Sequence, residues 1–582
     1  MSTEVPVLAV RGSTGVILSR GPPSYDPVTA FPTVTSKNCK VMLFSPNGQY
    51  FAWFDGSKIV VTLVSSWKVV QEIEKPKTMC LLFSPKGTYL CSWETFYVNQ
   101  ENPKGGPNLF IWKTETGELV HSYIHKKQIN WQLQFSKDEK ICARCLDGQV
   151  LIYEKANFET PTYKIQSPKV ADFSLSPGSI YHVLCYMPGS SGPSFGKLFK
   201  YPKFEHENCV ANKTFFKADR VDMYWNNKGT NVLLLTSTDV DKTNASYYGK
   251  QSLHFLSTKG DTAIVLLNKE GSIHSISWNP SGEEFCVIYG FMPAKAALFN
   301  TKCEVIFDFG SGPRNSIYYN PHGNIVLLGG FGNISGYVEI WDTVSRRRIT
   351  KMECSNTTLL QWSPDGTHFV TATTAPRLRV DNGFKIWHYS GALLYERPWN
   401  KQEELWEVTW QTYADSRFKK PTISFKHVEG IQSSEPTASK EVYRPPAARN
   451  LANPVKFNLH DNTDTAETRT LSKAALKMKK KRDAKRQAKL QQQQNQEENT
   501  TAVVNNGHSN SDNGAELRNA NAGDKTNNRN VDKDKIKKIK TNLKSIEKLK
   551  QLQASGKELD KNQLEKLNKE AELQEELKNL TL

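Results

Sequence analysis

The chain has 582 residues, of which 38% are hydrophobic and 23% are charged, and its formal net charge is +17 at pH 7. The part that precedes a change of composition near residue 430 is long enough to bury a large hydrophobic core. No run of about 18 apolar residues occurs, so neither a membrane-spanning helix nor a membrane partner is expected.

The first predicted elements are two strand-like pieces within residues 5–19. Residues 1–5 lack a basic region that leads into an apolar one, so no secretory signal is expected there. All ten cysteines lie between Cys39 and Cys354. We expect them to be reduced, mostly buried side chains, as in proteins of a reducing compartment.

Nine copies of one short pattern follow between residues 41 and 410. Each copy has alternating apolar residues, one large apolar or aromatic residue and a tight polar turn such as Ser45-Pro46-Asn47-Gly48, in which Pro presets φ and Gly supplies a positive φ. The large residues are Phe44, Phe83, Phe135, Leu175, Trp225, Trp278, Tyr319, Trp362 and Trp410. Their mean spacing is about 46 residues, a period typical of propeller blades.

We therefore predict an all-β fold, a WD40-like β-propeller over residues 1–430, with nine blades and a strand from the N-terminus completing the last blade. Eight blades, or seven blades with a small second domain, remain open, and a sandwich or barrel is the alternative fold. A further strand-like piece lies in residues 422–428. Candidate outer strands lie at residues 109–112, 150–153, 338–342 and 384–387.

Enzyme motifs are missing from this body. It contains no phosphate-binding loop, no His-Glu-x-x-His motif and no nucleophile elbow. Residues 329–332, Gly-Gly-Phe-Gly, precede a strand-like piece and are expected to form a turn. Cys142 and Cys145 have the spacing of zinc ligands but lack a second pair nearby, so we expect buried apolar side chains. The sequence predicts no catalytic residue, no metal and no cofactor.

A different composition begins after about residue 430. Residues 431–470 are expected to be a linker, and residues 471–490 a basic helical segment with nine basic residues and one acidic residue. This segment would neutralise RNA phosphates without reading bases, because it has no aromatic residue to stack on them. A nuclear localisation signal or a solubilising charge run are the alternatives. The expected RNA-binding residues are Lys477, Lys479, Lys480, Lys481, Arg482, Lys485, Arg486 and Lys489.

The end of the chain combines a polar linker with helices. Residues 491–530 are rich in Gln and Asn and are expected to be disordered. Helical periodicity returns in residues 531–582, where Ile536, Ile539, Leu543 and Ile546 form one apolar stripe. A broken helix that binds another molecule is expected, and a coiled-coil homodimer is the alternative.

Several unusual strings resemble the eukaryotic translation initiation factor 2A family, which is distinct from the α subunit of initiation factor 2. They include residues 215–219 (Phe-Phe-Lys-Ala-Asp), 375–380 (Ala-Pro-Arg-Leu-Arg-Val), 443–446 (Tyr-Arg-Pro-Pro) and 471–477. The resemblance implies a nine-bladed, cytoplasmic factor that binds the small ribosomal subunit. It also implies delivery of initiator methionyl-tRNA to the start codon of an mRNA without GTP, in alternative or stress-associated initiation. Other initiation factors are further candidate partners.

The C-terminal string also resembles the ribosome-binding end of a partner of the exon-junction proteins. Its candidate ribosome-binding residues are Ile546, Lys548, Leu549, Lys557, Gln563, Leu564, Lys566 and Leu567. If the basic segment does not bind RNA, the candidates on the propeller surface are Arg314, Arg377 and Arg379.

Two other functions remain open. One is a propeller like that found in initiation factor 3, although the protein with that propeller is expected to begin with an RNA-recognition motif, which is missing here. The other is a scaffold propeller that binds protein peptides and uses its basic tail for localisation.

Overall fold

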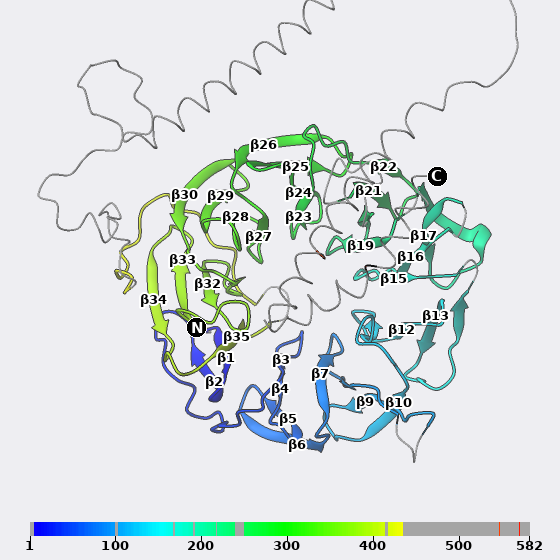
Figure 1. The fold of residues 1–582 in the computed structure, drawn as a ribbon, viewed down its shortest axis with the longest axis horizontal. Coiled ribbons are helices and arrows are strands. Elements are labelled where there is room, and N and C mark those ends of the chain that lie inside the picture. Colours follow the sequence, from blue (N-terminus) through cyan, green and yellow to red (C-terminus); the bar gives the residue numbers. More distant parts are fainter. Residues whose placement is uncertain are drawn as a thin grey trace, which may run out of the picture. The chain divides into compact units, whose positions relative to one another are not determined.

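The computed structural model describes residues 5–98, 103–166, 169–189, 192–216, 218–238, 249–413 and 417–434, together with Ile546 and Glu570. The chain divides into two compact units, Met1–Tyr443 and Arg444–Leu582. The described part of the first unit is a closed ring of nine antiparallel sheets (Figure 1). The predicted nine-bladed β-propeller is therefore confirmed.

Blades 1 to 8 have four strands each, and blade 9 has three. From the innermost strand outward, blade 1 consists of β3 (Met42–Phe44), β4 (Tyr50–Phe54), β5 (Lys58–Leu63) and β6 (Lys68–Glu74), and blade 2 consists of β7 (Thr78–Phe83), β8 (Tyr89–Glu94), β9 (Leu109–Lys113) and β10 (Leu119–Tyr123). Blade 3 consists of β11 (Gln134–Phe135), β12 (Ile141–Leu146), β13 (Gln149–Glu154) and β14 (Tyr163–Ile165), and blade 4 consists of β15 (Asp172–Leu175), β16 (His182–Met187), β17 (Ser194–Lys200) and β18 (Cys209–Phe215). A short 3-10 helix, His206–Asn208, precedes β18.

The remaining blades follow in the same order. Blade 5 consists of β19 (Arg220–Trp225), β20 (Asn231–Ser237), β21 (Gln251–Ser257) and β22 (Thr262–Ile264), and blade 6 consists of β23 (Ile273–Trp278), β24 (Glu284–Tyr289), β25 (Ala294–Asn300) and β26 (Val305–Gly312). Blade 7 consists of β27 (Ser316–Tyr319), β28 (Ile325–Gly329), β29 (Tyr337–Asp342) and β30 (Arg347–Glu353), and blade 8 consists of β31 (Leu359–Trp362), β32 (His368–Thr373), β33 (Gly383–His388) and β34 (Leu393–Pro398). Blade 9 consists of β35 (Leu405–Trp410), β1 (Val7–Gly12) and β2 (Gly15–Arg20).

Each large residue of the sequence repeat is the last residue of the innermost strand of its blade, from Phe44 in β3 to Trp410 in β35. In three blades the next residue is a buried Asn whose side-chain amide donates to a glycine carbonyl in the turn of the following blade. The pairs are Asn226 to Gly282 (3.0 Å), Asn279 to Gly323 (3.1 Å) and Asn320 to Gly366 (2.9 Å). These bonds couple neighbouring blades near the end of each inner strand.

The ring closes through the N-terminus, as predicted. Strand β1 pairs antiparallel with β35, with Leu8 opposite Trp410 and Val10 opposite Val408. Residues 27 and 34 add isolated bridges to β2, so this segment lies where the other blades have their fourth strand. The chain ends thus supply the sheet that removes the open edges of the first and last repeats.

Two strand predictions were wrong in detail. The candidate outer strands lie in β9, β13, β29 and β33, which are the third strands of their blades. Their apolar residues are buried because a neighbouring blade covers each face, whereas the outermost strands, such as β6 and β10, are largely exposed.

Residues 422–428 form no strand. They belong to an extended segment against blades 7 and 8. The Ser424 amide donates to the Tyr389 hydroxyl of blade 8 (2.8 Å), and the Arg347 guanidinium of blade 7 lies over the Phe425 ring. These contacts run to side chains, so no ladder forms. The segment continues into the start of the expected linker, where the Ile431 amide donates to the Leu393 carbonyl (2.7 Å).

Candidate nucleic-acid interface

The antiparallel blades sort the connections onto two faces of the ring. With the strands of a blade named A to D from the centre outward, the D-to-A and B-to-C connections lie at one end of the strands, the DA/BC face. The A-to-B and C-to-D connections lie at the other end, the AB/CD face. The sequence pattern places its polar turns on the AB/CD face, because each turn follows an A strand.

The connections at the two ends of the strands differ in charge. The described residues of the DA/BC connections carry fourteen basic and seven acidic side chains, a net charge of +7, whereas those of the AB/CD connections carry nine and twelve, a net charge of −3. The basic residues of the DA/BC face are Lys37, Lys40, Lys75, Lys77, Lys104, Lys126, Lys127, Lys169, Lys250, Lys269, Arg314, Arg377, Arg379 and Lys401. Its acidic residues are Asp55, Asp147, Asp219, Glu270, Asp381, Glu403 and Glu404. A face of one predominant sign attracts a polyanion.

Exposed apolar side chains favour the same face. Among the described residues, the large exposed apolar side chains of the DA/BC connections are Tyr97, Val98, Ile124, Ile129, Phe216, Leu266, Phe291, Met292 and Val380. On the AB/CD connections they are Ile180 and Val344. Clusters of exposed apolar residues mark interaction surfaces, so the DA/BC face is the candidate functional site.

Two of the predicted surface arginines lie on this face, in the B-to-C connection of blade 8. Arg377 and Arg379 are both exposed, and the Arg379 Nε lies 3.2 Å from a carboxylate oxygen of Glu404. Arg377 borders a cleft of about 340 Å³ between blades 7 and 8, which Phe331 and Asn356 also line. This cleft combines a guanidinium with an aromatic ring.

Glycines shape the wall of this cleft. Of residues 329–332, Gly329 ends β28 and the other three begin the connection between β28 and β29, with a bend at Gly332. Gly332 has φ of +79°, and a Cβ there would lie 2.9 Å from Nη2 of Arg377. A larger residue at position 332 would therefore be strained and would displace the guanidinium.

The third predicted arginine is not on the surface. Arg314 is buried, and its Nη2 lies 2.7 Å from Oε2 of Glu339, while both terminal nitrogens donate to the Phe309 carbonyl at 3.2 Å. Burial lowers the pKa of Arg314, and the Glu339 carboxylate opposes that effect. The prediction that Arg314 lies on the propeller surface is therefore wrong. Its backbone belongs to a DA/BC connection, and its side chain packs between β26 and β29.

Cys142 and Cys145 do not converge. Both lie on β12, three residues apart, so their side chains point to opposite sides of the strand and pack in different clusters. All ten cysteines are free thiols. Within the described ranges, no group of three or more His, Cys, Asp or Glu side chains could hold a metal ion. In that same part of the chain, none of the helical segments is long and apolar enough to cross a membrane.

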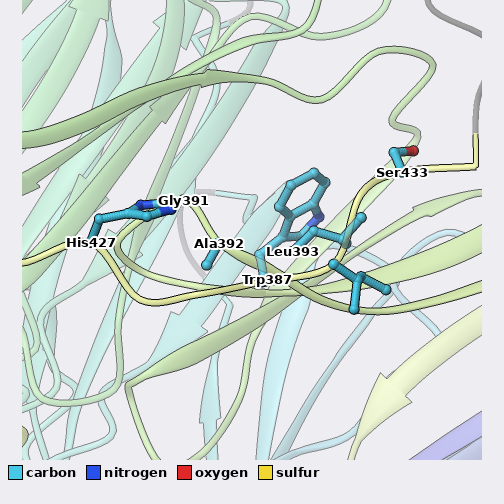
Figure 2. A pocket seen from close by; sticks show the side chains of 8 residues that line it. Trp387, Gly391, Ala392, Leu393, His427 and Ser433 are labelled. Atoms are coloured by element: carbon cyan, nitrogen blue, oxygen red, sulfur yellow. The ribbon is translucent and has the colours of Figure 1, made fainter.

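A second cleft, of about 250 Å³, lies under the extended segment of residues 417–434 (Figure 2). Trp387 and Leu393 of blade 8 line this cleft together with His427 and Ile431 of the segment. It lies beside the C-to-D connection of blade 8, away from the basic face, and is a gap left where the segment crosses the blade.

The expected tail sites lie outside the described residues. This holds for the basic segment (Lys477, Lys479, Lys480, Lys481, Arg482, Lys485, Arg486 and Lys489) and for Lys548, Leu549, Lys557, Gln563, Leu564, Lys566 and Leu567. Ile546 is described, and it is helical and buried.

The sequence prediction missed the basic face itself. The sequence did contain the information needed to find it. Each repeat marks the end of an A strand, so the connections that follow can be assigned to the two faces in alternation. Lys75 with Lys77, and Lys126 with Lys127, would then have fallen on one face.

Comparisons with known proteins cover most of the propeller. The protein-family model described as "Eukaryotic translation initiation factor eIF2A" matches residues 213–408. The Drosophila melanogaster protein of the same description is 46% identical over 471 residues, covering 78% of this chain and 74% of its own length. The Caenorhabditis elegans protein is 40% identical over 454 residues, covering 76% and 79%.

Two further similarities concern the fold. A solved structure described as "Crystal structure of the eukaryotic initiation factor" has a TM-score of 0.65 and 33% identity, and covers 71% of this chain and all 100% of that one. One component of initiation factor 3 from Dictyostelium discoideum is 25% identical over 365 residues, covering 60% of this chain and 54% of its own length.

Proposed function

The chain belongs to the eukaryotic translation initiation factor 2A family, and on this premise we propose that it binds the small ribosomal subunit and recruits initiator methionyl-tRNA to a start codon without GTP. Family membership makes it a translation initiation factor whose partners belong to the translation machinery. The specific partners, the small ribosomal subunit, the tRNA and the mRNA, are the proposal. Alternative or stress-associated initiation is the setting that we propose for it.

The observation that carries this proposal is the net charge of +7 on the DA/BC connections, against −3 on the AB/CD connections. Ribosomal RNA, tRNA and mRNA share a phosphate backbone, and lysines and arginines bind it while releasing counterions. A basic surface on one face would orient the ring with that face toward RNA.

The role that we propose is non-enzymatic. The basic side chains of the DA/BC face other than the buried Arg314, together with exposed apolar residues, suit binding. The arginine cleft between blades 7 and 8 offers a guanidinium and hydroxyl groups, and none of its described lining residues is a His, Asp, Glu, Lys or Cys. We place this role in the cytoplasm, where translation occurs and where the ten free thiols would stay reduced.

We propose a division of roles between the units. The DA/BC face, including Arg377 and Arg379, would contact RNA, the basic segment of residues 471–490 would add sequence-independent phosphate contacts, and residues 531–582 would bind the ribosome. Deleting residues 531–582 should then reduce comigration with small subunits, while the thermal unfolding of the propeller stays unchanged. Comigration at the original level would remove those residues from the proposal.

A reconstituted recruitment assay tests the function itself. Purified small subunits, an mRNA with one AUG and labelled initiator methionyl-tRNA are combined without GTP and separated by sedimentation. We expect the full-length protein to bring the tRNA into the small-subunit peak only with the AUG present. Elongator methionyl-tRNA is the matched control, and equal recruitment of both tRNAs, or of neither, would contradict the proposal.

The similarity to the initiation factor 3 component favours one second candidate, a scaffold that holds other initiation factors. A scaffold would comigrate with small subunits through protein contacts and would not need the basic face. Neutralising Arg377 and Arg379 would then leave comigration and tRNA recruitment unchanged.

A further inference from the structure

One part of the DA/BC face combines lysines with accessible aromatic rings. We name it the lysine–aromatic patch: Lys77, Phe96, Tyr97, Lys104, Lys126 and Lys127. These residues come from the three connections that meet over blade 2, residues 75–77, 95–108 and 124–133. Tyr97 is 55% exposed, and all four lysines are exposed.

Hydrogen bonds hold these connections together. Asn108 is buried, and its side-chain amide donates to the carbonyls of Glu94 (2.7 Å) and His125 (2.9 Å), while its oxygen accepts from the His125 amide (2.8 Å). The indole of Trp93 donates to the same His125 carbonyl at 3.2 Å. The lysines at 126 and 127 therefore follow an anchored residue and stay beside the aromatic connection.

Contacts with the rings order the patch further. Lys77 Nζ lies 3.9 Å from the centroid of the Tyr97 ring and 2.8 Å from its hydroxyl, and Lys126 Nζ lies 5.8 Å from the centroid of Phe96. Gly105 has φ of +73°, and a Cβ there would lie 2.3 Å from the Phe96 ring. Only glycine lets the connection close over this ring.

The patch carries little negative charge. Among the described residues, no carboxylate lies within ion-pair distance of its lysines. Among the described residues, Glu94 at the end of β8 is the nearby acid, and its pKa is raised by burial although Lys75 and Lys77 act in the opposite direction. In this part of the structure, Lys104, Lys126 and Lys127 are thus placed to meet an external anion.

This composition fits RNA better than a protein partner. Lysine is depleted in protein–protein interfaces, whereas lysines beside exposed aromatic rings are typical of surfaces that bind single-stranded nucleic acid. An aromatic ring stacks on a base only where the base is unpaired, in a loop, bulge or single strand.

We propose that the lysine–aromatic patch binds an unpaired stretch of RNA, with a base stacked on the Tyr97 ring and with Lys104, Lys126 and Lys127 on the neighbouring phosphates. This rests on the proposed RNA-binding function and adds the class of RNA: the patch selects unpaired nucleotides, which the arginine cleft and the basic tail segment do not require. Phe96, which contacts Gly105 and lies near the Lys126 ammonium, supports the connection.

Photo-crosslinking of the full-length protein to a single-stranded RNA of about twelve nucleotides tests the proposal, with the same sequence in a duplex as comparison. We expect crosslinks in residues 95–98 with the single strand and not with the duplex. Affinity is measured in a full-length background in which Lys479, Lys480, Lys481 and Arg482 are replaced by alanine. There, Tyr97→Ala should weaken single-strand binding about tenfold, and Tyr97→Phe should restore it.

Charge is tested separately from stacking. Lys126→Ala with Lys127→Ala should lower the slope of log affinity against log salt by about 1.4, whereas Lys259→Ala with Lys302→Ala on the AB/CD face should leave it unchanged. Equal crosslinking to the duplex, or a Tyr97→Ala variant with wild-type affinity, would overturn the patch proposal.

Two further outcomes are informative. If patch variants lower comigration with small subunits but leave RNA crosslinks and affinity unchanged, the occupant is a protein and the proposal is wrong. If tRNA recruitment fails while the single-strand crosslinks at residues 95–98 remain, the patch stands and the proposed initiation function falls.

Discussion

The Nε of Arg11 in β1 lies 3.0 Å from Oε2 of Glu407 in β35, and these two residues are 396 positions apart in the chain. The same guanidinium donates through Nη1 to the Cys39 carbonyl at 2.9 Å and lies over the Trp406 ring. Arg11 thus joins the first strand, the last strand and the connection into blade 1. The ring closes at this point by pairing of its first strand with its last.

Closure by the N-terminus predicts a global loss of stability on truncation. Deleting residues 1–20 removes both β1 and β2, exposes β35 and uncovers the buried Trp410. We expect the whole propeller to unfold at a markedly lower temperature in one transition, measured by calorimetry. Point variants give the magnitude. Replacing the buried Leu8 with alanine should lower the free energy of unfolding by about 2–5 kcal/mol, and replacing the exposed Val344 with alanine should lower it by less than about 0.5 kcal/mol. An unchanged melting temperature after truncation would show that blade 9 does not close the ring.

The buried pair Arg314–Glu339 makes a second stability prediction. Glu339→Ala leaves the Arg314 charge buried without its carboxylate, and the expected cost is about 3–5 kcal/mol of unfolding free energy. Arg348 is half exposed and 3.9 Å from the same carboxylate, so Arg348→Ala should cost less than about 1 kcal/mol. Arg314→Met with Glu339→Leu should recover most of the stability, and RNA affinity should not change. A large loss of RNA affinity in that double variant would indicate that Arg314 contributes to RNA binding.

His254 predicts an acid-sensitive core. It is 4% exposed, neither ring nitrogen has a hydrogen-bond partner among the described residues, and its ring stacks on Phe215. Burial, and then Lys213, lower the pKa of His254 from 6.5 to about 4. The unfolded chain therefore binds more protons between these pH values, so the native state loses stability as the pH falls from 6.5 toward 4.

Denaturant unfolding at two pH values checks this sign. Replacing His254 by Phe should leave stability at pH 7.5 equal or higher, and at about pH 5 it should add about 1–2 kcal/mol relative to the wild type. His388, whose pKa is also lowered to about 4 mainly by burial, remains in that variant, so some acid sensitivity persists. An equal pH dependence of the two proteins would show that His254 is not buried as a neutral ring.

The basic tail segment predicts a salt-dependent, sequence-independent contribution to RNA binding. If about six of its lysines and arginines contact phosphates, the slope of log affinity against log salt for single-stranded RNA is about −4. Replacing Lys479, Lys480, Lys481 and Arg482 with alanine should reduce the slope by about 3 and weaken all RNA sequences alike. Alanine favours helix, so a structural loss is a poor explanation. A wild-type slope after the substitution would assign RNA binding to the propeller alone.

The repeat itself was predictable because Pro, Gly and a large residue recur for local reasons: the turn needs a fixed φ and a positive φ, and the inner strand needs bulk next to the following blade. The rank of a strand within its blade was mispredicted, because the outermost strands, such as β6 and β30, carry charged residues and lack the apolar pattern of residues 109–112. The burial of Arg314 was hidden for a different reason. Its partner, Glu339, is 25 residues away on β29, and only the fold brings the two together.

For residues 422–428, the sequence pattern predicted a strand that the structure lacks. Their apolar alternation suggested a strand, but Phe425 packs against the Arg347 side chain of blade 7, and only farther along does the Ile431 amide donate to the Leu393 carbonyl of blade 8. The candidate site was predictable only in part. Arg377 and Arg379 lie on the basic face as surface residues, whereas the charge difference between faces emerges once each connection is assigned to an end of the strands.

A crosslinking map of the full-length protein on the small ribosomal subunit with initiator methionyl-tRNA tests the nucleic-acid interface most directly. Crosslinks from the propeller to RNA should fall on the DA/BC connections, near Lys77, Lys126 and Arg377, and the AB/CD residues Lys259 and Lys302 should stay free of RNA. Propeller crosslinks to RNA that fall mainly on the AB/CD connections would contradict the assignment of the RNA-binding face.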